Sequence, residues 1–265
     1  LAKKPTTNQE AYELYLKGRY FWNKRTAADL RKSIDYFNEA IAKDPDFAVA
    51  YAMLAQAWTL LPGYSGGTPI ECFPQAEASA KKALSLDERA ADAHAALAMV
   101  KQLFNFDSPG AIAEFQRAIE LDPNDATAHH WFANHSLSAT GQIGRETTEI
   151  KRALELDPLS LIINTNVGQA YIYANRFDEA IAQLRKTVEM DDSFYFAHWI
   201  PGEVLELNGQ MSEAMAEYQN AMALNDDAFP KTLLGHLCGK RGRKSAALTI
   251  EQELVEARTK PHFAA

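Results

Sequence analysis

A short phrase recurs along the chain at a nearly constant interval, and this repetition restricts the fold more than any other feature. Two clear copies are Ala-Ile-Glu-Leu-Asp-Pro at 118–123 and Ala-Leu-Glu-Leu-Asp-Pro at 153–158. Successive copies are 43, 35, 35, 34 and 34 residues apart, and they end at Pro45, Glu88, Pro123, Pro158, Asp192 and Asp226. A period near 34 is typical of two helices joined by a turn. One such pair cannot bury its apolar face alone, so the sequence predicts an all-α solenoid of stacked helix pairs.

Apolar and small residues return at constant offsets from this phrase. Upstream lies a stripe at helical spacing, such as Ala111, Phe115 and Ala118. Downstream, a small residue that permits close helix approach marks the centre of the next predicted helix, at Ala55, Ala98, Ala133, Gly168 and Gly202. This pattern resembles the tetratricopeptide repeat over almost the whole chain. The resemblance implies a right-handed superhelix of antiparallel helix pairs, with the first helix of each pair on the concave side.

The repeat register divides the chain. We expect an N-terminal linker at 1–10, an array at 11–260, and the start of a truncated further segment at 261–265. The array holds about seven repeats, which start near residues 11, 48, 91, 126, 161, 195 and 228. Proline and glycine in Thr59–Pro74 predict a long loop inside the second repeat. Pro201 falls within a predicted first helix, where it favours a kink or a shifted start.

Three segments carry a closer resemblance, namely residues 12–26, 129–133 and 157–164. They are similar to the C-terminal arrays of large bacterial signalling proteins. In those proteins the array follows a winged-helix transcriptional regulator, a nucleotide cyclase or a Ser/Thr kinase domain. The resemblance implies an effector domain before Leu1 and a regulatory or docking role for the array. We expect a cytoplasmic location, or a periplasmic one if a membrane span precedes this region.

The concave positions of the first helices are the predicted ligand groove. Aromatic residues lie toward its ends and uncharged amides toward its middle. Amides both donate and accept hydrogen bonds, which suits an extended peptide backbone, and aromatic side chains are typical interface anchors. The alternative for the aromatics is packing against flanking loops or domains. The candidate groove residues are Tyr15, Arg19, Trp22, Gln56, Met99, Gln102, His130, Asn134, Gln169, Phe196, Trp199, Glu203 and Glu206.

Some family members hold a C-terminal carboxylate with a clamp of Lys, Arg and Asn on this surface. The matching positions here are Ala52, Gln56, Ala95, Met99, Thr165 and Gln169. We therefore expect no binding of acidic C-terminal chaperone tails. Because Glu203 and Glu206 should face inward, a neutral or basic ligand is favoured.

Charge and motifs argue against other classes of function. The net charge of −8 disfavours nucleic acid and anionic membrane surfaces as partners. No apolar run reaches the ~20 residues of a membrane span, so we expect no insertion. His94, His129 and His198 recur at the repeat position of Tyr51, which indicates packing rather than metal binding. No nucleophile elbow or phosphate-binding loop is found, so we expect no catalytic residue, cofactor or metal.

The sequence therefore favours a non-catalytic scaffold that binds a peptide or helix of a partner protein in its groove. Self-association stays open as an alternative, in which the array forms a homodimer and pairs upstream effector domains. A third and weaker alternative is an enzyme whose Thr59–Pro74 loop closes over a pocket.

Overall fold

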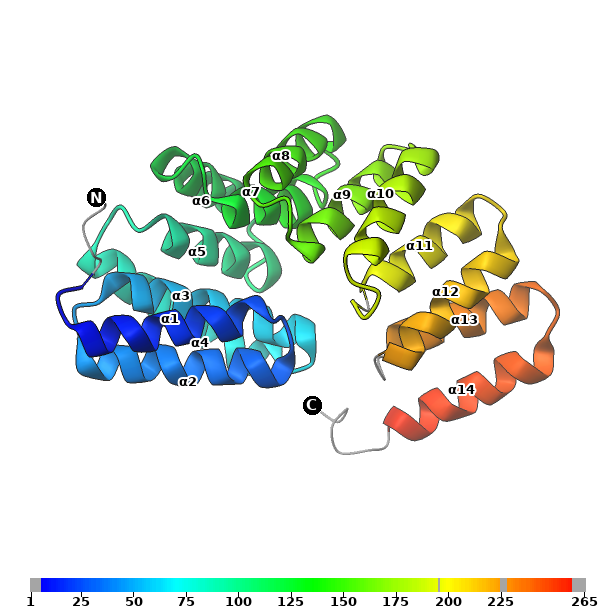
Figure 1. Cartoon of the computed structure of the whole chain (residues 1–265), viewed down its shortest axis with the longest axis horizontal. Helices are drawn as coiled ribbons and strands as arrows, with labels where there is room; N and C mark the ends of the chain where they lie inside the picture. The colour runs from blue at the N-terminus through cyan, green and yellow to red at the C-terminus, as the bar shows by residue number, and fades with distance from the viewer. Residues whose placement is uncertain (1–5, 195, 225–227, 259–265) are drawn as a thin grey trace. The chain divides into compact units, whose positions relative to one another are not determined.

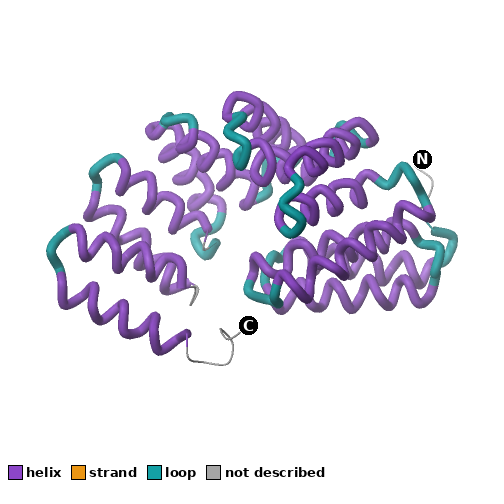
Figure 2. The backbone as a smooth tube through the Cα atoms, turned by 180° about the vertical axis from the view of Figure 1, so that it is seen from behind, coloured by secondary structure: helices purple, strands orange, loops and turns teal. Residues whose placement is uncertain are grey.

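The computed structural model describes residues 6–194, 196–224 and 228–258. Within these ranges the chain is helical, with 14 α-helices, two short helical segments η1 and η2, and no β-strand (Figures 1 and 2). The helices form antiparallel pairs in sequence order, which confirms the predicted all-α solenoid of stacked pairs. The chain divides into two compact units, unit 1 (residues 1–142) and unit 2 (residues 143–265).

Unit 1 contains three complete helix pairs and the first helix of a fourth. At the first pair, the Gly18 Cα lies so close to Phe37 that an added Cβ would meet its ring at 2.5 Å. The core continues through Phe47, Phe115 and Trp131, all nearly inaccessible to solvent. The elements are α1 (Gln9–Asn23), α2 (Ala27–Lys43), α3 (Ala48–Leu60), η1 (Leu61–Tyr64), α4 (Pro69–Leu86), α5 (Ala91–Leu103), α6 (Ser108–Leu121), α7 (Ala126–Trp131) and η2 (Phe132–Leu137).

Unit 2 repeats the same packing. A Cβ on Gly168 would lie 2.5 Å from Leu184, and one on Gly202 would lie 2.3 Å from the Tyr218 ring. The small residues that the sequence places at helix centres thus lie where paired helices approach most closely. The elements are α8 (Ile143–Leu156), α9 (Leu161–Tyr173), α10 (Phe177–Met190), α11 (Phe196–Leu207), α12 (Met211–Leu224), α13 (Ala228–Lys240) and α14 (Lys244–Arg258).

The turns inside the pairs share a left-handed residue before the second helix. Its φ is 55° at Arg25 and at Phe106, and 56° at Asn175. Glycine occupies the corresponding place at Gly209 and Gly242. A left-handed backbone is strained for residues other than Asn, Asp or Gly, so Arg25 and Phe106 are unusual residues at this position.

The long loop predicted at Thr59–Pro74 is wrong over its second half. Helix α4 already begins at Pro69, and the connection is shortened further by the 3-10 turn η1. Thr68 and Glu71 cap α4 reciprocally, and proline is tolerated in a first helical turn, so Pro69 begins the helix instead of preventing it. Helix α11 also continues through Pro201 to Leu207.

The predicted linker at 1–10 overlaps α1, which begins at Gln9, and the Thr6 hydroxyl hydrogen-bonds to the Asp44 carboxylate. The predicted repeat start at Tyr195 and the segment 261–265 lie outside the described residues. Over the part of the chain that is described, no helix combines the length and apolar character needed to cross a bilayer.

Candidate functional site on the inner helices

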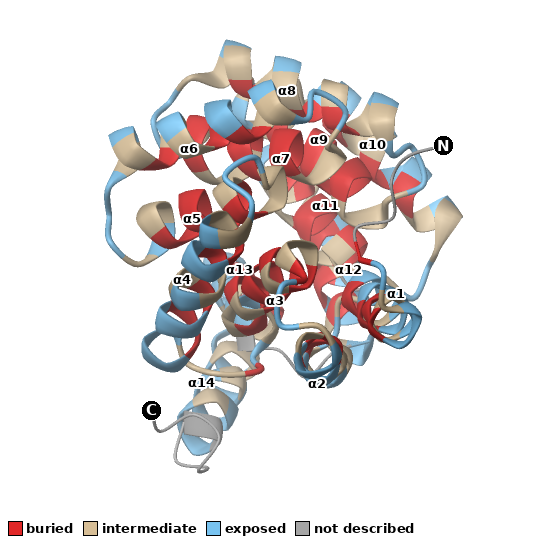
Figure 3. Ribbon diagram, turned by 90° about the vertical axis from the view of Figure 1, so that its left-hand side faces the viewer, coloured by how far each residue is buried: buried red, intermediate tan, exposed pale blue. Residues whose placement is uncertain are grey.

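The first helix of each pair carries the predicted groove positions and is called an inner helix: α1, α3, α5 and α7 in unit 1, and α9, α11 and α13 in unit 2. Most of the predicted groove residues of unit 1 are buried by their own chain. Tyr15, Trp22, Gln56, Met99 and His130 are 6%, 6%, 1%, 2% and 4% exposed. Figure 3 shows the same contrast between α7, which is largely buried, and α4, which has a long exposed face. The inner helices of unit 1 are therefore packed together and offer only part of their predicted surface to a ligand.

The residues of this set that remain accessible are Arg19, which is exposed, and Gln102 and Asn134, which are half-buried. The Gln102 side chain accepts a hydrogen bond from the Ser136 hydroxyl at 3.2 Å. Asn134 forms no side-chain hydrogen bond to a described residue. Its amide is thus the clearest candidate in unit 1 for pairing with a peptide backbone.

Two carboxyl groups lie at the N-terminal ends of inner helices α5 and α7. Burial raises the pKa of Asp92, and the neighbouring Asp125 raises it further. Burial likewise raises the pKa of Asp125, whose Oδ2 has no hydrogen-bond partner among the described residues. Gln56 Nε2 donates to Asp92 Oδ1 at 3.0 Å, so the most buried predicted groove amide is already engaged within the chain.

Near the opposite ends of the inner helices, Arg25 forms a second polar centre in unit 1. Its guanidinium stacks on the Trp22 indole, with Cζ 3.8 Å from the ring centroid. The same guanidinium donates a hydrogen bond to the Tyr64 hydroxyl oxygen. Trp22 also contacts Trp131 across the inner face, with ring centroids 6.5 Å apart. Arg25 and Tyr64 are half-buried, whereas Trp22 and Trp131 are buried.

His130 and His135 share the helix face beside this centre because the helix changes its winding. Segment η2 is π-helical, and Ser138 N donates to Ala133 O at 3.0 Å. In a π-helix, residues five apart lie one above the other. Burial lowers the pKa of His135 to about 4, and it lowers the pKa of His130 well below its usual value.

Sequence reasoning missed Arg25, Tyr64 and His135. The first two lie in turns, outside the inner helix positions. His135 was missed because an α-helical projection from His130 selects Asn134, four residues on. Arg25 follows Trp22 by three residues, and a cation so near an aromatic residue was a possible signal of stacking. Nothing in the sequence showed that the Arg25 backbone would be left-handed.

The predicted groove residues of unit 2 are more accessible, since Gln169, Phe196, Trp199, Glu203 and Glu206 are all half-buried. The aromatics continue onto the next inner helix: the Trp199 ring meets Phe229 of α13 edge-on at 4.9 Å. Phe229 is 47% exposed. Unit 2 therefore carries a partly open aromatic row that spans α11 and α13.

The inward acids of unit 2 are not equivalent. Glu206 binds Lys240 Nζ at 2.8 Å and accepts a longer hydrogen bond, 3.3 Å, from the Tyr218 hydroxyl. The pKa of Glu203 is raised mainly by burial and, to a smaller extent, by the negative charge of Glu206. The Glu206 charge is thus balanced within the chain, which weakens one of the two reasons for expecting a basic ligand.

The recurring histidines lie in a structural slot. Ring Nε2 of His129 contacts the carbonyl of Pro123 at 3.1 Å, and His198 makes the same contact to Asp192 at 2.8 Å. His198 Nδ1 also lies 2.9 Å from Glu217 on the second helix of its pair. These contacts tie each first helix to the preceding turn. No cluster of metal-binding side chains occurs among the described residues.

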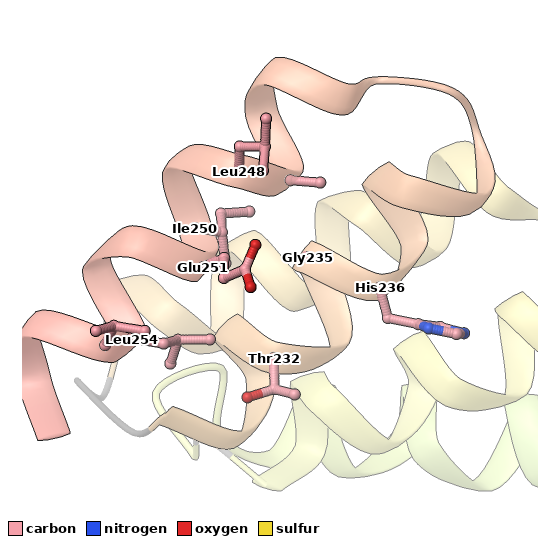
Figure 4. A pocket seen from close by; sticks show the side chains of 9 residues that line it. Thr232, Gly235, His236, Leu248, Ile250, Glu251 and Leu254 are labelled. Carbon is pink, nitrogen blue, oxygen red and sulfur yellow. The ribbon is translucent and has the colours of Figure 1, made fainter.

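An apolar groove of about 490 Å³ lies between α13 and α14 (Figure 4). Leu248, Ile250 and Leu254 line it from α14, and Thr232 and His236 line it from α13. Leu248 is 56% exposed and Val255 60%, so α14 presents an apolar face that no described residue covers.

Comparison with known proteins agrees with this architecture. Residues 166–231 match the family model of the tetratricopeptide repeat. No match was found among curated protein sequences.

Solved structures extend the likeness beyond that segment. The chain superposes on a monomeric mutant of IFIT1 with Gppp-AAAA at a TM-score of 0.75 and 14% identity, covering 86% of this chain and 55% of that one. PilW, a widely conserved type IV pilus biogenesis factor, gives a TM-score of 0.65 at 19% identity, covering 82% and 96%. A thermophilic TPR protein of Thermus thermophilus gives 0.58 at 21%, covering 65% and 93%. Residues 166–231 thus carry the tetratricopeptide-repeat sequence pattern, and the chain is built as a tetratricopeptide-repeat solenoid.

Proposed function

We propose that the chain is a non-catalytic scaffold whose inner helices bind an extended peptide or a helix of a partner protein. Tetratricopeptide-repeat proteins generally mediate protein–protein interactions. The observation that carries the proposal is the aromatic row Phe196, Trp199 and Phe229, which remains partly open on the inner helices of unit 2. Half-buried aromatic rings flanked by polar side chains are the usual anchors of protein interfaces.

Accessible amides supply the complementary polar contacts. Asn134 in unit 1 and Gln169 in unit 2 are half-buried, and neither side chain is hydrogen-bonded to a described residue. Each amide can donate to and accept from a backbone peptide group. On either unit the proposed ligand is therefore bound by backbone pairing, and on unit 2 also by aromatic anchoring.

A random peptide library displayed on phage and selected on the wild-type protein tests this function without a known partner. Selected peptides are titrated calorimetrically into wild type and into the double variant Asn134→Ala/Gln169→Ala. We expect the dissociation constant to rise about tenfold or more in the variant, because the hydrogen bonds of two side chains to the peptide backbone are lost. The matched control, Glu77→Ala/Lys81→Ala, removes an ion pair on α4 and should bind as wild type does. Equal binding by all three proteins would exclude Asn134 and Gln169 from the ligand surface and contradict backbone pairing by these amides.

The resemblance to the arrays of bacterial signalling proteins supports a regulatory or docking role within a larger protein, in the cytoplasm or, after a membrane span, in the periplasm. On this proposal, a partner held by the array controls or recruits an effector domain that precedes Leu1. Expression of the array together with its upstream region, with and without a selected peptide, should change the activity of that effector domain.

Homodimer formation is the second candidate, and the uncovered groove between α13 and α14 favours it. An apolar face such as that of α14 can be buried by the same face of a second copy. Light scattering at increasing concentration should then show a dimer that Leu248→Asp returns to monomer. A monomer at every concentration would rule this candidate out and leave peptide binding untouched.

A further inference from the structure

Arg25 has a left-handed backbone conformation, which is unusual for arginine. Its φ of 55° is matched by 55° at Phe106 and 56° at Asn175, and glycine takes this place at Gly209 and Gly242. Asparagine and glycine adopt the left-handed region with little strain, whereas arginine does not. Phe106 retains the same strain with an exposed ring, whereas the Arg25 side chain is half-buried and charged. The strain together with that burial points to a role for the Arg25 side chain.

The Arg25 charge is half-buried and lacks an anion. Its interactions within the described residues are the stack on Trp22 and the hydrogen bond with Tyr64, and no carboxylate is among them. Trp22 Nε1, which belongs to the indole under the guanidinium, is buried and has no acceptor among the described residues. Buried charges are normally paired, and unsatisfied buried donors are rare, so two unmet requirements coincide at one place.

The matched turn of unit 2 shows what is missing. Arg176 Cζ lies 4.6 Å from the Tyr171 ring centroid, in a stack of the same kind. There Arg176 Nε donates to Glu179 Oε2 at 2.6 Å, so the chain supplies a carboxylate for the stacked guanidinium. In unit 1 the carboxylate at the place of Glu179 is Asp29, which accepts a hydrogen bond from the Thr26 hydroxyl at 2.8 Å. The Arg25 guanidinium therefore has no carboxylate among its described partners.

We propose that Arg25, stacked on Trp22 and held by Tyr64, is an anion site that binds one carboxylate group of a partner peptide. The assignment deepens the proposed function and rests on it only in taking the carboxylate to belong to a peptide. Arg25 lies in the turn after α1, outside the inner positions from which the sequence favoured a neutral or basic ligand. The expectation of a neutral or basic ligand was therefore made without taking the Arg25 charge into account.

The charge of the site selects carboxylate over phosphate. His130 lies near Arg25 and His135 lies near His130. Burial lowers the pKa of both rings, which keeps them uncharged at neutral pH. A single guanidinium balances a monoanion and can form two parallel hydrogen bonds with a carboxylate. A phosphate dianion would retain an uncompensated negative charge in a half-buried site.

Acetate is the simplest probe, and the Trp22 indole N–H is a built-in reporter. Two-dimensional nitrogen–proton spectra of the whole chain resolve the indole resonances, and Trp22→Phe assigns the one that matters. Acetate replaces chloride at constant ionic strength. We expect a saturable shift of the Trp22 resonance in wild type, and binding weakened about tenfold or more in Arg25→Asn. Arg25→Asn retains a residue that this chain already accepts at Asn175.

Two further variants and one competitor complete the test. Arg176→Asn removes the guanidinium that is already paired, and acetate binding should be unchanged. Arg25→Lys keeps the charge without the planar fork, and should bind acetate measurably but several-fold more weakly; equal binding would contradict a guanidinium-specific site. Inorganic phosphate should bind more weakly than acetate, and tighter phosphate binding would overturn the carboxylate assignment. A Trp22 resonance that ignores acetate, or that responds equally in Arg25→Asn, would overturn the site itself.

These outcomes are separate from those of the peptide selection. The acetate titration reports on Arg25 even if no library peptide binds. Conversely, peptides that lose affinity in Asn134→Ala/Gln169→Ala but not in Arg25→Asn would support the scaffold and contradict the carboxylate site.

Discussion

Units 1 and 2 are built from the same kind of helix pair, but among the described residues the arginine that stacks on an aromatic ring has a carboxylate partner only in unit 2. In unit 2, Arg176 lies on Tyr171 and is paired with Glu179. In unit 1, Arg25 lies on Trp22 with a phenol hydroxyl and no carboxylate among its described partners. The difference shows how one motif serves two purposes. A guanidinium that finds its anion within the chain stabilises a turn, whereas one that does not is available to a ligand.

The two units also differ in how their inner helices are filled. Trp22 and Trp131 meet across unit 1 and bury much of its predicted groove. In unit 2, Trp199 and Phe229 form an edge-on pair that stays partly open. A filled inner face gives a rigid site for a small group such as a carboxylate, and an open one gives room for apolar side chains of a partner.

The largest expected effect on stability comes from removing a buried ring from the inner helices of unit 1. Trp131 is fully buried, so Trp131→Ala should lower the free energy of unfolding by about 3 to 5 kcal/mol. Asn166 occupies the same place in α9, and Asn166→Ala should cost only about 1 kcal/mol, the usual loss for a buried hydrogen-bonding group. Urea denaturation followed by circular dichroism measures both. Similar losses would show that the inner faces are packed alike.

A second pair of variants contrasts a satisfied acid with an unsatisfied one. Glu114 in unit 1 bonds His94 and Lys101, and these contacts lower its pKa to about 2. Glu146 in unit 2 is 2% exposed, its Oε2 has no partner among the described residues, and burial raises its pKa to about 7. Substitution by glutamine should therefore have opposite effects on stability at neutral pH.

The signs follow from proton linkage. The low folded pKa of Glu114 stabilises the native state above the unfolded pKa of ~4.3, and this stability is lost as pH falls toward 2. The raised pKa of Glu146 makes stability fall as pH rises from ~4 through 7. At pH 8, Glu114→Gln should lose about 1 to 3 kcal/mol and Glu146→Gln should gain a similar amount. Near pH 4 the gain from Glu146→Gln should vanish, and a gain that persists there would refute burial as its cause.

The smallest expected effect concerns the turns. Phe106 is 85% exposed on a left-handed backbone, so Phe106→Gly should raise stability by about 0.5 to 1 kcal/mol. Gly209 has the same kind of turn with φ of 79°, and Gly209→Ala should cost about 1 kcal/mol although its Cβ would meet nothing within 4 Å. Thermal denaturation of the two variants checks both signs, and a loss on Phe106→Gly would reveal an unrecognised contact of that ring.

The helix pairs and their closest contacts could be predicted from the sequence because they depend on local periodicity. Gly168 and Gly202 lie against large side chains, as a small residue at a helix crossing predicts. The start of α4 at Pro69 could not be recognised from proline content alone, because the cap formed by Thr68 and Glu71 decides it.

The site was harder to predict because it depends on contacts between distant parts of the chain. The meeting of Trp22 with Trp131 joins residues from different helix pairs, and no periodic pattern encodes it. The π-helical winding of η2 brings His135 onto the face of His130, where an α-helix would place Asn134. The role of Arg25 depends on a turn conformation and on the absence of a nearby described carboxylate, neither of which composition reveals.

A crystal structure of the wild-type protein with a library-selected peptide tests the central claim most directly. We expect the peptide on the inner helices, with one of its carboxylates forming two hydrogen bonds to the Arg25 guanidinium, and with Arg176 still paired to Glu179. A peptide bound to the outer helices, or an inner peptide with no anionic group at Arg25, would contradict the account.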